Sequence, residues 1–125
     1  MAHWSDGYID IPHSELDCAE LVERVLREQF GYTVRWPRRT ADDLEHRSGM
    51  IVASRDEYAH QISAPHDGCG VLMFCRGRRA HMGLYALIGG VGYVLHSDSR
   101  HGASVRMPVD RVHRVYKIEG YYDWL

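Results

Sequence analysis

The hydrophobic positions between residues 18 and 30 repeat at helical spacing. Apolar side chains recur three or four residues apart, which places them on one face of a helix. These positions are Cys18, Leu21, Val22, Val25, Leu26 and Phe30. Asp17 and Glu20 match a capping box, and Gly31 is a typical helix stop. The pattern therefore predicts a helix that begins at Cys18 and ends before Gly31.

Two shorter helices are predicted after this first one. Thr40 is suited to cap a helix that runs to about Arg47, with Asp43 at its third position. A weaker helical pattern covers residues 55–61.

From Gly68 onward the pattern changes to short apolar runs that are typical of strands. The runs cover residues 71–75, 81–88, 93–96, 103–107 and 112–118. Gly89 and Gly90 separate the second run from the third, and such a pair predicts a tight hairpin turn. Helices followed by consecutive strands indicate an α+β domain. We expect the first helix to pack on an antiparallel sheet of about five strands.

The size and charge of the chain restrict the function classes that it can serve. It has 125 residues, 45% of them hydrophobic, so residues 1–125 are expected to form one domain. The formal net charge of −2 predicts no nucleic-acid partner. No apolar run is long enough for a membrane span, and the first residues do not resemble a signal peptide. We therefore expect synthesis in the cytoplasm without a signal peptide.

Three cysteines without a C-x-x-C pair suggest neither a disulfide framework nor a zinc site. Cys75 lies in an apolar run and is expected to be buried, whereas Cys69 lies in a glycine loop that could expose it. Cys18 differs from both because it opens a helix. Helix N-termini stabilise anions, and the thiolate is the nucleophilic form of cysteine. Cys18 is therefore the candidate nucleophile.

His81 and His96 are the candidate partners of this thiol. Attack on a carbonyl needs a base within hydrogen-bond reach of sulfur and a third polar group that orients the base. His81 starts one predicted strand and His96 ends the next, so they would lie at similar height across the glycine turn. Spacing alone leaves the alternative open that both are surface histidines among the nine in the chain.

Motifs in family order span almost the whole chain. They are Tyr8, Asp17-Cys18 with residues 21–28, the runs 71–74 and 81–85, Val94-Leu95-His96-Ser97 and the closing segment 118–122. Together they resemble the NlpC-type cell-wall cysteine peptidases, a papain-like group, and most closely the branch encoded in phage tail operons. The resemblance implies the papain-like NlpC-type fold.

The resemblance also implies roles for four residues. Cys18 would be the nucleophile, His81 the general base and later acid, and His96 the group that orients the His81 ring. The hydroxyl of Tyr8 would stabilise the oxyanion together with the backbone N–H of Cys18. No metal or cofactor is implied.

The implied activity is that of a cysteine endopeptidase that hydrolyses stem peptides of peptidoglycan. Its partners would be the peptidoglycan peptide and phage tail proteins, and it would act on the cell wall as part of a phage tail. Two alternatives remain, a secreted antibacterial amidase toxin with the same residues and a catalytically idle tail-assembly module.

Overall fold

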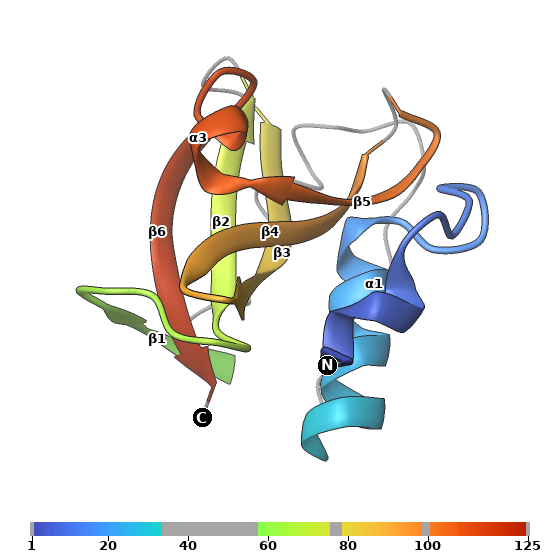
Figure 1. The fold of residues 1–125 in the computed structure, drawn as a ribbon, viewed down its shortest axis with the longest axis horizontal. Coiled ribbons are helices and arrows are strands. Elements are labelled where there is room, and N and C mark those ends of the chain that lie inside the picture. The colour runs from blue at the N-terminus through green and yellow to red at the C-terminus, as the bar shows by residue number, and fades with distance from the viewer. Residues whose placement is uncertain (1, 34–57, 76–78, 99–100, 125) are drawn as a thin grey trace.

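The computed structural model describes residues 2–33, 58–75, 79–98 and 101–124. The helix predicted from Thr40 to Arg47 lies outside these residues. The described helical segments are η1 (Trp4–Tyr8), α1 (Cys18–Val25), η2 (Leu26–Phe30) and α3 (Val109–Val112). The strands are β1 (Ala59–Ile62), β2 (Gly70–Cys75), β3 (Arg79–Ile88), β4 (Val91–Asp98), β5 (Ala103–Pro108) and β6 (Lys117–Trp124). The expected α+β class is confirmed (Figure 1).

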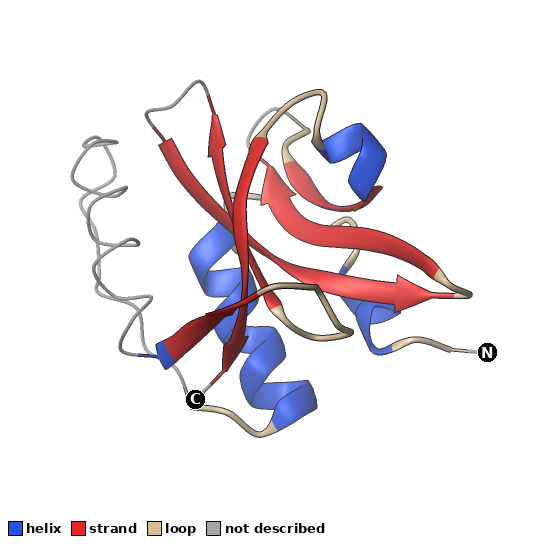
Figure 2. Cartoon of the chain, turned by 90° about the vertical axis from the view of Figure 1, so that its left-hand side faces the viewer, coloured by secondary structure: helices blue, strands red, loops and turns tan. Residues whose placement is uncertain are grey.

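The strands form one open antiparallel sheet in the order β1-β6-β2-β3-β4-β5. It has six strands, where about five were expected. The sheet is strongly twisted, so that β4 and β5 run across the direction of β2 and β6 (Figures 1 and 2).

Two local predictions are wrong. Of the weak helical pattern over 55–61, residues 55–57 lie outside the described residues and 59–61 belong to β1, where Ala59 pairs with Trp124. Pairing between distant segments overrides local preference here. The strand predicted over 112–118 begins only at Lys117. The segment before it contains the end of α3, which follows Pro108, and a turn in which the Tyr116 N–H donates to the Val112 carbonyl.

The first helix begins where the sequence predicts. The Asp17 carboxylate accepts a hydrogen bond from the Glu20 backbone N–H at 3.0 Å. The Glu20 carboxylate folds back and accepts from the Asp17 N–H at 3.4 Å, which completes the capping box. After one π-helical turn, Gly31 ends the helical segment with a left-handed φ of 71°. Among the described residues, no helix has the length and apolar character needed to cross a membrane.

The predicted hairpin turn is also confirmed. Gly89 and Gly90 have φ angles of 58° and 79°, the left-handed conformation that a tight two-residue hairpin turn needs at both positions. From this turn the β3–β4 ladder runs to the pair Leu84↔Leu95.

Two hydrophobic cores lie on the two faces of the sheet. The α1-side core joins buried residues of α1 to strand residues that include Leu72, Met82, Leu84 and Leu95. The α3-side core contains Val71, Met73, Val94, Met107, Val112 and Tyr116. Because strand side chains alternate between faces, Met82 belongs to the first core, whereas His81 points to the second.

The residues before α1 run beside β5. Backbone bonds join Asp10 N to Ser104 O, Ser104 N to Ile11 O, and His13 N to Gly102 O, at 2.8–2.9 Å. The Ser104 hydroxyl donates to the Tyr8 carbonyl at 2.5 Å. The lead-in to α1 is therefore fixed along the β5 edge of the sheet.

Asp17→Ala is expected to lower the free energy of unfolding by about 1 kcal/mol, because it removes the acceptor that satisfies the Glu20 N–H. Urea unfolding measures the loss. Glu15→Ala is the matched control, since Glu15 is an exposed carboxylate just before the helix, and it should change stability little. Equal stability of the two variants would contradict a stabilising cap.

Candidate active site

Cys18 is the first residue of α1 and is fully buried in the α1-side core. The Asp17 cap beside it is also buried, with 5% of its surface exposed. A substrate carbonyl can therefore reach the Cys18 sulfur only if neighbouring groups move apart.

Hydrogen bonds tie the segment before Cys18 to the end of β4. The Ser97 hydroxyl donates to the Leu16 carbonyl at 2.6 Å, and His13 Nδ1 lies 3.0 Å from the same hydroxyl oxygen. Since Ser97 follows His96 in the chain, the N-terminal end of α1 is held beside the strand that carries this histidine.

His81 and His96 form a buried hydrogen bond. Nε2 of His81 lies 2.9 Å from Nδ1 of His96, and the two rings are nearly perpendicular at 87°. His81 is 9% exposed and His96 is fully buried. The structure therefore brings these two predicted site residues together, and they are not scattered surface histidines.

Their proximity depends on Gly83. Extending the β3–β4 register beyond Leu84↔Leu95 places Gly83, rather than His81, opposite His96. A Cβ atom on Gly83 would lie 2.7 Å from the Leu95 carbonyl oxygen and 3.1 Å from the His96 Cβ. Only a residue without a side chain lets β4 approach here, so that the His96 ring reaches diagonally to His81.

Burial keeps the His96 ring neutral. It lowers the pKa of His96 from its ordinary value of 6.5 to about 4, with Asp98 opposing that shift and His101 adding to it. Nδ1 of a neutral His96 can accept a hydrogen bond from the Nε2–H of His81. In that tautomer, Nδ1 is the His81 nitrogen that can act as a base.

This tautomer has an energetic cost. His96 Nε2 would then carry a proton, and within the described part of the chain this atom is buried without a hydrogen-bond partner. Such a donor costs about 1–3 kcal/mol. Unpaired buried groups of this kind are uncommon and are enriched at functional sites.

Cys18 and His81 come from two elements that pack against each other, α1 and β3. Cys18 packs in the α1-side core with Met82 and Leu84, whereas His81 contacts Tyr116 in the α3-side core. The structure thus joins His81 to His96, and it places Cys18 beside the same two strands.

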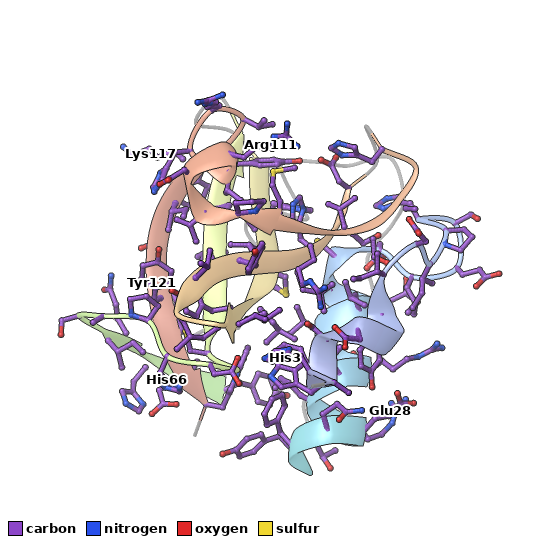
Figure 3. The ribbon with its side chains drawn as sticks, in the orientation of Figure 1. His3, Glu28, His66, Arg111, Lys117 and Tyr121 are labelled. Carbon is purple, nitrogen blue, oxygen red and sulfur yellow. The ribbon has the colours of Figure 1, made fainter. Side chains whose placement is uncertain are left out.

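The structure places the Tyr8 hydroxyl away from the start of α1. This hydroxyl donates to the Glu28 carboxylate at 2.7 Å and accepts from the Gln29 amide at 3.0 Å. Glu28 lies at the far end of the helical segment (Figure 3), ten residues and roughly 15 Å of helix beyond Cys18. The expectation that this hydroxyl lies at an oxyanion site beside Cys18 is therefore not met. The tyrosine instead holds η1 against the end of the helix.

The sequence predicted a buried Cys75 and a Cys69 that could be exposed. Cys69 is fully buried and not exposed, and burial raises its pKa to about 11, so this thiol is not activated. The side chain of Cys75 lies outside the described part of the structure. No group of three or more His, Cys, Asp or Glu side chains among the described residues could hold a metal ion.

A groove of about 440 Å³ lies elsewhere on the molecule, between the β3–β4 turn, the start of α3 and β6. Its lining includes Tyr85, Tyr121, Pro108, Val109 and Asp110. None of Cys18, His81 and His96 lines it. The groove is therefore separate from the histidine pair.

Sequence reasoning missed one residue of the site, Tyr116. Its ring stacks on His81 with centroids 5.0 Å apart and planes within 11°, and it stands at 86° to the His96 ring. The residue lies in the turn between α3 and β6, inside a segment that the sequence predicted to be a strand. No spacing signal connects it to His81, since β2 separates the two strands.

Gly83→Ala is expected to lower the free energy of unfolding by about 1–3 kcal/mol, because a backbone carbonyl must move to admit the methyl group. The displacement should also lengthen the His81–His96 bond, which a crystal structure or histidine NMR would detect. Gly7→Ala is the control, since a Cβ on Gly7 meets no atom within 4 Å. An unchanged histidine pair in a fully stable Gly83→Ala protein would refute the role given to this glycine.

The free energy of unfolding should decrease as the pH is lowered, because of His96. A histidine whose pKa is lowered on folding binds fewer protons in the folded than in the unfolded state. Its contribution is complete above about 6.5 and is lost as pH falls to about 4, by roughly 3 kcal/mol in total. Urea unfolding at several pH values measures this slope.

His96→Asn should flatten that slope between pH 6.5 and 4, because asparagine does not titrate. His60→Asn, at an exposed position in β1, should leave the slope unchanged. The same slope in the wild type and His96→Asn would show that His96 is not the group responsible.

No protein-family model matches the chain, and no curated protein matches it either. The resemblance to the NlpC-type peptidases therefore rests on the motifs in the sequence.

Proposed function

We propose that the protein is a cysteine peptidase that hydrolyses amide bonds in peptidoglycan stem peptides, as part of a phage tail. The observation that carries this proposal is the buried Nε2–Nδ1 hydrogen bond between His81 and His96. It leaves Nδ1 of His81 for proton transfer and lies on strands that pack against the helix opened by Cys18. The motif resemblance supplies the substrate class.

The reaction would proceed in two stages. Nδ1 of His81 takes the thiol proton of Cys18, and the resulting thiolate attacks the amide carbonyl carbon. The His81 imidazolium then gives that proton to the leaving amine. Departure of the amine leaves the acyl group on the Cys18 sulfur as a thioester. Water deprotonated by His81 hydrolyses the thioester, releasing the acid and restoring the thiol. The first proton transfer requires the Cys18 sulfur and Nδ1 of His81 to come within hydrogen-bond reach during the reaction.

His96 would act through His81. Its low pKa keeps it an acceptor, so it can stabilise the N–H that His81 presents when the ring becomes an imidazolium. The helix N-terminus would add a favourable field for the thiolate, and the backbone N–H of Cys18 is the remaining candidate donor for the oxyanion. Tyr8 does not enter this scheme, because its hydroxyl is engaged by Glu28 and Gln29.

One observation favours a second candidate function, a catalytically idle tail-assembly module. Cys18 has no exposed surface, and it belongs to the same hydrophobic core as Leu84 and Leu95. A cysteine with this packing also serves as a small core side chain. The two candidates differ in whether the thiol reacts and whether its reactivity depends on His81.

Cys18→Ser and His81→Asn should each abolish cleavage of purified muropeptides, measured by mass spectrometry. Both residues act in one covalent step, so the double variant should lose no more activity than either single variant. His96→Asn should retain measurable activity, because an orienting group contributes less than the base. Cys69→Ala, which removes an unactivated thiol, is the control and should cleave normally if it folds.

Alkylation with iodoacetamide separates the candidate functions. In a Cys75→Ser background, the folded peptidase should react at Cys18 far faster than at Cys69, and His81→Asn should slow the reaction at Cys18. An idle module would show slow alkylation at both cysteines, with no dependence on His81. Selective reaction without cleavage of any stem peptide would refute the substrate class and leave a thiol hydrolase for another amide.

A further inference from the structure

The Tyr116 ring is fixed independently of the histidines that it contacts. Its backbone N–H donates to the Val112 carbonyl at 2.8 Å, and Val112 is fully buried in the α3-side core. Only 7% of Tyr116 is exposed. The turn after α3 therefore presents this aromatic face to His81 at a set position.

The stack and the hydrogen bond restrict different motions of His81. The bond to His96 restrains the position of Nε2, and the ring can still tilt through small changes of the two side-chain torsions of His81. The stack at 11° fixes the plane of the ring. The stack therefore adds a restraint on the direction of Nδ1 that the hydrogen bond to His96 does not supply.

We propose that Tyr116 is a positioning residue for His81, an inference that rests on the proposed peptidase function. Its ring holds the His81 plane so that Nδ1 keeps one direction, and it shields the His81–His96 bond from water. An aromatic face also attracts the imidazolium that forms when His81 takes a proton. The face of the ring performs this role, so the phenolic hydroxyl is not required.

The test compares Tyr116→Phe, which keeps the ring, with Tyr116→Leu and Tyr116→Met, which remove it. Tyr116→Phe should stay within about twofold of the wild type in kcat and in the rate of Cys18 alkylation. The two ring-less variants should lose about tenfold in kcat, equivalent to about 1.4 kcal/mol, with KM changed by less than about twofold. Two such variants are used so that one that fails to fold does not decide the result.

Tyr121→Leu is the matched control. This tyrosine lies on β6 and points to the same face of the sheet, but its aromatic contact is with Tyr85, at 5.9 Å between centroids. It should leave the rate of Cys18 alkylation unchanged. An equal loss in this control would mean that any disturbance of the α3-side core has the effect.

Histidine side-chain NMR gives a readout that does not depend on activity. Tyr116→Leu or Tyr116→Met should move the His81 ring signals and change the balance of its tautomers, whereas Tyr116→Phe should preserve that balance. Unchanged His81 tautomers in a folded ring-less variant would overturn the positioning role. So would a Tyr116→Phe variant as impaired as Tyr116→Leu, because the hydroxyl would then be the group that matters.

The failure of the peptidase proposal looks different. In that case wild-type Cys18 alkylates no faster than Cys69, and His81→Asn has no effect on it. The NMR comparison then still shows whether Tyr116 fixes the His81 ring. A fixed ring supports the positioning role, and a ring unaffected by the loss of Tyr116 refutes it.

Discussion

The buried hydrogen bond between His81 and His96 is the constraint on which the rest of the site depends. Two imidazole rings are removed from water, and the burial that lowers the pKa of His96 also makes it an acceptor at neutral pH. The hairpin sets the two strands in register, and Gly83 allows them to approach. The core around this pair is made of apolar side chains. Burial of apolar surface explains their packing, but it does not explain two buried histidines that share a hydrogen bond.

Much of this arrangement could be predicted from local sequence. The helix start at Cys18 and the turn at Gly89-Gly90 follow from capping and backbone conformation, which depend on a few neighbouring residues. The histidine pair followed from hairpin geometry, although counting from the turn missed by two residues because the contact is diagonal. A glycine inside a strand is itself a signal of close approach, and Gly83 carried that signal.

The parts that could not be predicted depend on contacts between distant segments. β1 forms only because β6 offers it a partner, and Tyr116 reaches His81 across β2 from a turn with no strand pattern. Tyr8 is a residue for which the motif suggested a place beside Cys18, and the fold places its hydroxyl elsewhere. Its hydroxyl donates to Glu28, because η1 packs along the helix and not across its start. Motif order constrains which residues are present, but not which side chains meet.

The lead-in residues beside β5 have a consequence for association between molecules. The edge strand of an open sheet exposes backbone groups that invite another chain to add a strand. At one edge, backbone groups of Ser104 and Gly102 are hydrogen-bonded to the lead-in residues Asp10, Ile11 and His13. The other edge is β1, which is only four residues long. The segment that guards this edge also leads directly into the helix start at Cys18. Proteolytic removal of it would therefore do two things at once, exposing a strand edge to self-association and releasing the anchor of the thiol.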